Sequence, residues 1–114
     1  GDAVEIKLFW QSVTRHIERD YTVFVHLVDA DGALIAQHDG QPGNGEQPTS
    51  GWRYEEVVPE TRILVLPETL PPGTYALRVG LYDLRTMQRL EVLDVNGRII
   101  GDFSPLSNLT VGPD

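Results

Sequence analysis

The richest grouping of chemically active side chains is residues 51–56, with the sequence GWRYEE. An aromatic ring can stack on the apolar face of a pyranose sugar, while amides and carboxylates bond its hydroxyls. Trp52 and Tyr54 supply the rings, and the polar partners nearby are Arg53, Glu55, Asn44 and Gln47. This stretch therefore predicts a carbohydrate-binding site.

Trp52 also has a structural interpretation, which we favour. A tryptophan in a long loop often folds back as a plug over the open end of a β-sandwich, where its large apolar surface is covered by neighbouring side chains. The sequence alone leaves both roles open for Trp52.

A second candidate site is the segment Asp29-Ala30-Asp31-Gly32, which resembles the opening of a calcium-binding loop. Calcium prefers several carboxylate and carbonyl oxygens around a sharp glycine turn. The acidic residue expected at the twelfth position of such a loop is missing, because position 40 is Gly40. A hairpin turn is therefore the better prediction, with Asp29 and Asp31 as a weak calcium candidate and no other metal site.

The sequence lacks the usual signatures of enzymes. It contains no Gly-x-Ser-x-Gly nucleophile motif, no His-Glu-x-x-His zinc motif and no phosphate-binding glycine loop that ends in Gly-Lys-Ser/Thr. The three histidines, at positions 16, 26 and 38, are scattered along the chain. We predict that the protein is not an enzyme, with no catalytic residue and no cofactor.

The elements that must position these residues are strands, because apolar residues recur with period two. We expect one domain over residues 1–114, an all-β fold with seven to eight antiparallel strands in an immunoglobulin- or fibronectin-III-like β-sandwich. Residues 21–28 are apolar on both faces and predict a central strand, and residues 39–60 predict one long loop that carries Trp52. The expected strand-forming runs are residues 4–10, 21–28, 33–38, 61–66, 74–83, 89–93 and 106–111. Two matching segments, Asp-x-Asp-Gly at position 29 and Asp-x-Asn-Gly at position 94, predict two hairpins with the same turn chemistry.

Composition excludes several classes of partner. The 114 residues carry 9 basic and 17 acidic side chains, a formal charge of −8 and no cysteine. Nucleic acids and anionic membrane surfaces are bound mainly through cationic side chains, so neither is an expected partner. No apolar run approaches the roughly 20 residues of a membrane span. Because the chain opens with Gly1-Asp2, we expect it to be a piece of a longer protein.

Three segments together resemble a known family: residues 21–32 (YTVFVHLVDADG), 37–42 (QHDGQP) and 70–83 (LPPGTYALRVGLYD). They are similar to a β-sandwich domain at the C-terminal end of bacterial mannosyltransferase-like membrane glycosyltransferases, and the likeness runs from about residue 3 to residue 111. The resemblance implies an extracytoplasmic appendage of a membrane-embedded parent protein whose catalytic centre lies elsewhere. No catalytic residue carries over to this chain.

The leading hypothesis is therefore a non-catalytic accessory domain, displayed outside the cytoplasm, that contacts glycan or a neighbouring protein domain. A stand-alone carbohydrate-binding module that uses Trp52 and Tyr54 is the second hypothesis. The third is a structural interaction domain, in which an exposed strand edge pairs with a partner or a second copy.

Overall fold

The structure is a computed structural model that describes residues 2–94 and 96–112. Within these residues nearly all regular structure is β, and the all-β prediction is confirmed. The elements in chain order are β1 (Ala3–Gln11), β2 (Thr22–Val28), β3 (Leu34–Gly40), the 3-10 helices η1 (Pro42–Gly45) and η2 (Thr49–Gly51), β4 (Val57–Val65), β5 (Gly73–Asp83), β6 (Gln88–Arg89), β7 (Val92–Leu93), β8 (Ile99–Gly101) and β9 (Ser104–Val111). In the part of the chain that the structure covers, no helix has the length and apolar character needed to cross a membrane.

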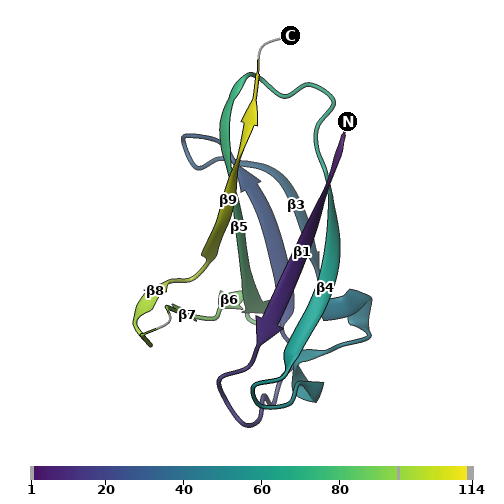
Figure 1. The fold of residues 1–114 in the computed structure, drawn as a ribbon, viewed down its shortest axis with the longest axis vertical. Helices are drawn as coiled ribbons and strands as arrows, with labels where there is room; N and C mark the ends of the chain where they lie inside the picture. Colours follow the sequence, from purple (N-terminus) through teal and green to yellow (C-terminus); the bar gives the residue numbers. More distant parts are fainter. Residues whose placement is uncertain (1, 95, 113–114) are drawn as a thin grey trace.

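The strands form antiparallel sheets. β1 pairs with β4 along its whole length, from Ala3 opposite Val65 to Gln11 opposite Val57. The larger sheet has the order β3-β2-β5, and β6 and β9 both pair with the remaining edge of β5. β7 and β8 form a separate hairpin. The prediction that residues 21–28 are a central strand is confirmed, because β2 has a neighbour on each side (Figure 1).

One apolar cluster joins the two sheets. Alternate residues of β2 and β5, among them Val23, Leu27 and Val79, face the same side of the large sheet and are buried. Leu8 and Leu64 of the β1–β4 pair belong to the same cluster. Complete burial of one such side chain stabilises the fold by about 1.5–3 kcal/mol, so this shared cluster holds the two sheets together.

Both predicted turns form, with the same hydrogen bonds. Asp29 Oδ1 accepts the backbone N–H groups of Asp31 and Ala33, each at 2.9 Å. Asp94 Oδ1 accepts those of Asn96 and Arg98, at 2.8 and 3.0 Å. Gly32 and Gly97 have φ angles of 84° and 80°, a left-handed conformation that glycine adopts without steric cost. The prediction of shared turn chemistry is confirmed.

Two predicted boundaries are wrong. The irregular segment spans residues 41–56 rather than 39–60, because β3 continues to Gly40 and β4 begins at Val57. Pro59 hid this strand start from sequence reasoning, but a proline is tolerated in a strand that pairs on one side, as β4 does with β1. Residues 89–93 also do not form one strand, since the chain leaves β5 after Arg89 and pairs with β8 from Val92 onward.

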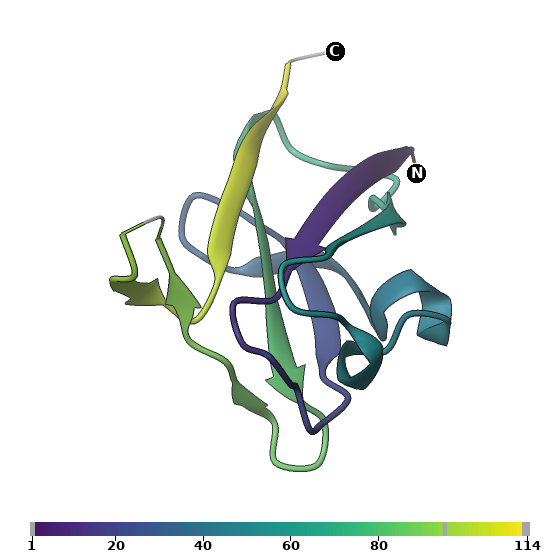
Figure 2. The same cartoon turned by 60° about the horizontal axis from the view of Figure 1, so that its bottom comes forward.

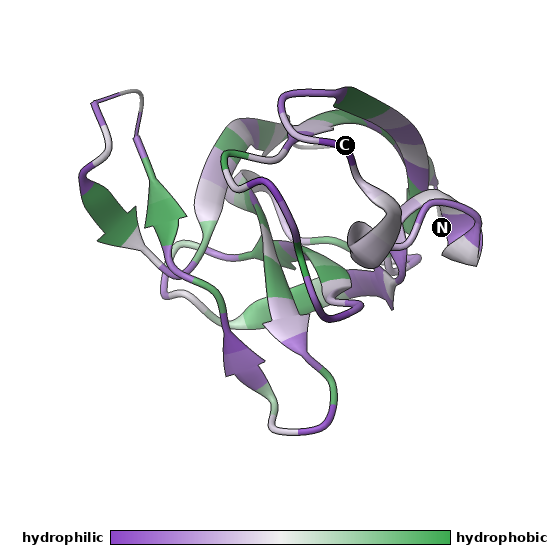
Figure 3. Ribbon diagram, turned by 90° about the horizontal axis from the view of Figure 1, so that it is seen from below, coloured by the Kyte–Doolittle hydropathy of each residue, from purple (hydrophilic) through white to green (hydrophobic). Residues whose placement is uncertain are grey.

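Several loops lie at the end of the molecule opposite the two termini. β1 begins and β9 ends at the top of Figure 1, whereas η2 and the connection between β1 and β2 lie at the bottom. When the bottom comes forward, the β1–β2 connection lies between η2 and the β5–β6 turn (Figure 2). Seen from below, these loops are largely hydrophilic, and the β7–β8 hairpin projects from the body with apolar strands (Figure 3).

Candidate functional site

Trp52 follows η2 directly and is packed into the molecule. Its side chain is only 8% exposed, and its ring centroid lies 6.2 Å from that of Trp10. The indole N–H donates a hydrogen bond of 2.9 Å to the backbone carbonyl of Gln47. This burial fits the structural role that the sequence left open, because most of the ring surface is covered.

The remaining exposed part of Trp52 lines a shallow pocket of about 310 Å³. We call it the Trp52 pocket. Val57 and two prolines contribute apolar surface, and its polar residues include Glu46, Gln47 and Glu56. Carboxylates and an amide beside apolar surface match the polar and apolar faces of a sugar ring. The pocket is therefore suited to a small hydroxylated ligand.

The other side chains of the predicted platform lie outside this pocket. Tyr54 is 42% exposed, and the guanidinium carbon of Arg15 lies 4.9 Å from its ring centroid. Arg53 and Glu55 are exposed next to it, and Asn44 is exposed on η1. The structure thus brings Trp52 together with Gln47, which the sequence analysis named as nearby, and with two glutamates that it did not assign to the site.

A buried carboxylate fastens the irregular segment that forms this pocket. Glu60 Oε1 accepts the N–H of Gly43 at 3.2 Å and the Nε–H of Arg62 at 2.7 Å, while Oε2 accepts the indole N–H of Trp10. The side chains of Glu60 and Arg62 are 1% and 4% exposed. Glu60 therefore connects β1, β4 and η1 through one side chain.

Arg62 extends the same network to the end of β3. Its Nη2 donates to the carbonyl oxygens of Gly40 and Gln41, at 2.9 and 3.2 Å, and its Nη1 lies 3.4 Å from His38 Nδ1. Within the described residues, every buried side-chain nitrogen and oxygen has a hydrogen-bond partner. A buried ion pair is tolerated when its remaining polar atoms are bonded in this way.

In the predicted calcium candidate, Asp29 and Asp31, the carboxylate of Asp29 stabilises the hairpin turn. Asp29 Oδ1 bonds two backbone N–H groups of its own turn, and Asp31 is exposed at the tip. Across residues 2–94 and 96–112, no three acidic or histidine side chains converge as metal ligands would.

The outer face of the large sheet carries a histidine, a carboxylate and a tyrosine in contact. The hydroxyl of Tyr82 donates to Asp39 Oδ2 at 3.0 Å, and His26 Nε2 lies 3.8 Å from Asp39 Oδ1. The ring of Phe24 lies 4.7 Å from His26 and is covered by Arg89, whose guanidinium carbon is 4.4 Å from the ring centroid. His26, Asp39, Tyr82 and Phe24 pack the outer face and line neither the Trp52 pocket nor the second pocket described below, whereas Arg89 lines the second pocket.

Burial displaces two pKa values in this cluster. The pKa of His26 is lowered from its ordinary 6.5, mainly because burial disfavours the charged ring, and Arg89 and Arg78 add to this against the opposing charge of Asp39. The pKa of Tyr82 is raised above 10.0 by burial and by its hydrogen bond to the Asp39 carboxylate. Both groups therefore favour their neutral forms at pH 7.

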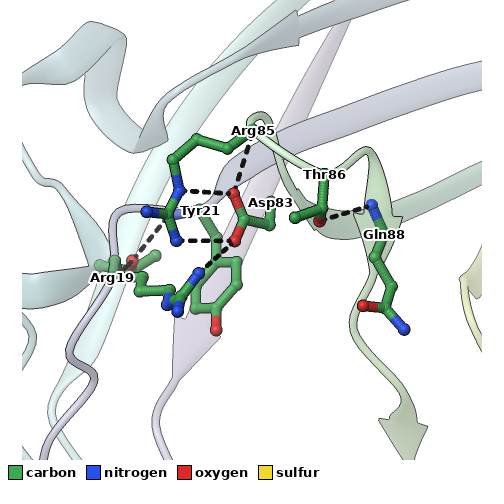
Figure 4. A network of polar contacts seen from close by, with 7 residues as sticks. Arg19, Tyr21, Asp83, Arg85, Thr86 and Gln88 are labelled. Carbon is green, nitrogen blue, oxygen red and sulfur yellow. Dashed lines mark hydrogen bonds and ion pairs between the residues drawn. The ribbon is translucent and has the colours of Figure 1, made fainter.

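A second pocket, of about 540 Å³, shares no lining residue with the Trp52 pocket. We call it the Arg19 pocket. Its lining comes from the end of that connection, the end of β5 and the chain around β6, with the side chains Arg19, Tyr21, Asp83, Thr86, Gln88, Arg89, Leu90 and Glu91. Figure 4 shows Arg19 and Arg85 converging on the carboxylate of Asp83.

Sequence reasoning missed this second pocket because its parts are far apart in the chain. Arg19 and Asp83 are 64 positions apart, and neither lies in a recognisable motif. The only local signal is the tight turn after Asp83, where Asp83 Oδ1 accepts the backbone N–H of Arg85 at 3.0 Å.

Comparisons with known proteins found no match, either to a family model, to a curated protein or to a solved structure.

Proposed function

We propose that this chain is a non-catalytic accessory domain that contacts glycan through the Trp52 pocket. The proposal includes an immunoglobulin- or fibronectin-III-like β-sandwich, displayed outside the cytoplasm as part of a membrane glycosyltransferase-like protein. The observation that carries it is the Trp52 pocket itself, in which Gln47, Glu46 and Glu56 surround apolar surface.

The arrangement of the fold supports a binding role for this end of the molecule. The irregular segment is anchored to the body by buried Glu60, so the pocket walls are held in place before a ligand arrives. Preorganisation of this kind lowers the entropic cost of binding. A parent chain joined at β1 or at β9 would leave the loop end free, because both strands reach the opposite end (Figure 1).

The test is a titration of ¹⁵N-labelled protein with neutral mannose and glucose oligosaccharides, followed by NMR. We expect amide shifts concentrated in residues 46–58. Gln47→Ala and Glu56→Ala should each weaken binding about five- to tenfold, since a lost hydrogen bond to an exposed ligand costs about 1–1.5 kcal/mol. Both residues are exposed, so their variants should fold normally, and exposed Glu68→Ala is the matched control.

Trp52→Ala is a poor first variant because the residue is buried. Truncating a buried tryptophan typically costs about 3–5 kcal/mol of stability, so lost binding could reflect unfolding. Shifts that are absent for all the neutral sugars, or equal in Glu56→Ala and the unaltered protein, would contradict glycan binding at this pocket.

A second candidate function is docking of a protein partner on the β1–β4 pair. The face of this pair that points away from the shared cluster exposes Phe9 at 70%, Val57 at 54% and Val65 at 66%. Apolar side chains gathered on one exposed face are typical of interaction surfaces. Sedimentation over a range of concentrations tests self-pairing, and Phe9→Ser should abolish any association that is seen.

A further inference from the structure

Asp83, which lines the Arg19 pocket, binds two guanidinium groups: that of Arg19, which also lines the pocket, and that of Arg85, which does not. Asp83 Oδ2 accepts hydrogen bonds from Arg19 Nη1 at 2.9 Å and Arg85 Nη2 at 3.3 Å. Its Oδ1 accepts the backbone N–H of Arg85 at 3.0 Å and the side-chain Nε–H at 3.4 Å (Figure 4). Because the Asp83 side chain is only 14% exposed, its two oxygens serve these arginines rather than solvent.

The arginines themselves keep much of their binding capacity. The side chains of Arg19 and Arg85 are 54% and 67% exposed. A guanidinium has five N–H donors, and in the described residues Arg19 donates one of them, to Asp83. Exposed ion pairs contribute at most about 1 kcal/mol to stability, so the pairing with Asp83 adds little to the stability of the fold.

Arg89 is the second arginine that lines the pocket. It lies over the ring of Phe24 and donates to Asp102 Oδ1 at 3.4 Å. Two of the nine cationic side chains in a chain of charge −8, Arg19 and Arg89, therefore line one pocket. The planar fork of arginine matches the two oxygens of a carboxylate.

The rest of the lining determines which anion fits. Glu91 and Asp83 place negative charge in the same pocket, which disfavours ligands with several negative charges. Thr86, Gln88 and Tyr21 offer hydroxyl, amide and aromatic contacts. A pocket of about 540 Å³ lies within the usual range for small ligands. The chemistry favours a ligand with one carboxylate and several hydroxyls.

We propose that the Arg19 pocket binds an acidic sugar residue, a pyranose that carries one carboxylate. Arg19 and Arg89 face the carboxylate, and Thr86, Gln88 and Tyr21 contact the ring and its hydroxyls. This inference rests on the proposed glycan-binding function and names the class of sugar that a second pocket selects.

The 3-10 helix η2 connects the chain segments that line the two pockets. Thr49 of η2 accepts the N–H of Tyr21 at 3.0 Å and donates to the carbonyl of Arg19 at 2.6 Å. Ser50 N–H donates to Asp20 Oδ1 at 3.0 Å. η2 thus ties the segment that carries Arg19 and Tyr21 to the segment that carries Trp52.

The test compares methyl glucuronoside with methyl glucoside, which differ by a carboxylate in place of a hydroxymethyl group. We expect the glucuronoside to shift amides in residues 19–21 and 83–91 and to bind at least tenfold more tightly there than the glucoside. Arg19→Gln should abolish this preference, and Arg19→Lys should restore part of it, because charge returns without the planar fork. Arg15→Gln, which alters a cation that stacks on Tyr54, is the matched control.

Three results would overturn the inference. Equal binding of the two glycosides would show that the carboxylate is not recognised, and equal binding of sodium acetate would show that the sugar is not. Glucuronoside shifts confined to residues 46–58 would place the ligand elsewhere. Failure of the proposed function is separate, because it is the loss of neutral-oligosaccharide shifts in residues 46–58.

Discussion

Replacement of Glu60 by glutamine is the sharpest test of how the irregular segment is held. Three donors point at this carboxylate: the N–H of Gly43, the Nε–H of Arg62 and the indole N–H of Trp10. A glutamine side chain has one accepting oxygen and one NH₂ group, so the NH₂ group must face a donor. The substitution also leaves the Arg62 charge buried without its counterion.

The expected loss of stability in Glu60→Gln follows from the burial of Glu60 and Arg62. Removing one partner of a buried ion pair costs about 3–5 kcal/mol, because the remaining charge stays desolvated. The Glu60 and Arg62 side chains are 1% and 4% exposed, so that value applies with little discount for solvent screening. For a domain of this size, roughly 4 °C of melting temperature corresponds to 1 kcal/mol, which predicts a fall of about 12–20 °C.

Urea unfolding followed by tryptophan fluorescence is the appropriate assay. Both tryptophans, Trp10 and Trp52, lie at this network, with ring centroids 6.2 Å apart. Glu60→Gln should lower the unfolding free energy by about 3–5 kcal/mol and change the native emission spectrum. Exposed Glu68→Gln, a matched charge loss, should stay within about 0.5 kcal/mol of the unaltered protein.

A double-mutant cycle separates the charge pair from general damage. Glu60→Leu combined with Arg62→Met should cost clearly less than the sum of the two single changes, since no uncompensated charge remains. A loss below 1 kcal/mol for Glu60→Gln, or strict additivity in the cycle, would refute the reasoning that a buried carboxylate fastens residues 41–56.

The remaining predictions concern local features. Gly80→Ala should destabilise the protein by about 1–3 kcal/mol in urea unfolding, because its Cβ would overlap the Phe24 ring and lie 3.1 Å from a backbone carbonyl, whereas Gly51→Ala meets nothing and should be neutral. The folded-state pKa of His26 lies below its unfolded value of 6.5, so its contribution to stability is present above pH 6.5 and is lost as pH falls; the fall in melting temperature between pH 7.5 and 5.5 should shrink in His26→Gln. Asp29→Ala removes two hydrogen bonds to the backbone and should cost about 1–2 kcal/mol by thermal unfolding; an unchanged melting temperature would argue against the turn role.

Features that depend on neighbouring residues in the chain were predictable. The central position of β2 follows from a run that is apolar on both faces, and the structure buries Phe24 as well as Val23 and Val25. The turns at Asp29 and Asp94 were equally predictable, because the aspartate side chain of each turn accepts hydrogen bonds from backbone groups within four positions.

Features that depend on distant partners were not predictable. The inward positions of β4 include Glu60 and Arg62, which break the apolar alternation that marks a strand. Their burial makes sense only with Trp10, 50 positions from Glu60, and with the ends of β3 and η1. Pro59 and Glu60 together therefore led sequence reasoning to place the strand start at residue 61 and to assign the preceding residues to a loop.

The candidate site also has one part that the sequence predicted and another that it did not. Trp52 was identified from composition alone, since a tryptophan beside charged residues outside a strand is conspicuous. Its separation from Tyr54 was not foreseeable, because the isolated bridge between Tyr54 and Ser12 draws that ring toward the β1–β2 connection. The Arg19 pocket requires the end of β5 to approach that connection, which only the fold specifies.

The Glu60–Arg62 network is buried, whereas in the network of Asp83 with Arg19 and Arg85 the two arginines are exposed to solvent. We therefore expect the two networks to have different roles. Glu60 and Arg62 are buried, so any change to either is felt as lost stability. Arg19 and Arg85 are exposed around Asp83, so Arg19→Gln should change the melting temperature by at most a few degrees. Both results are needed to separate the two roles. If Glu60 variants lose stability while Arg19 variants lose only the preference for the glucuronoside, the Glu60–Arg62 network stabilises the pocket walls and the Asp83 network recognises the ligand. A large stability loss in Arg19→Gln would instead show that the Asp83 cluster stabilises the fold. It would remove the physical basis for a carboxylate-binding site there.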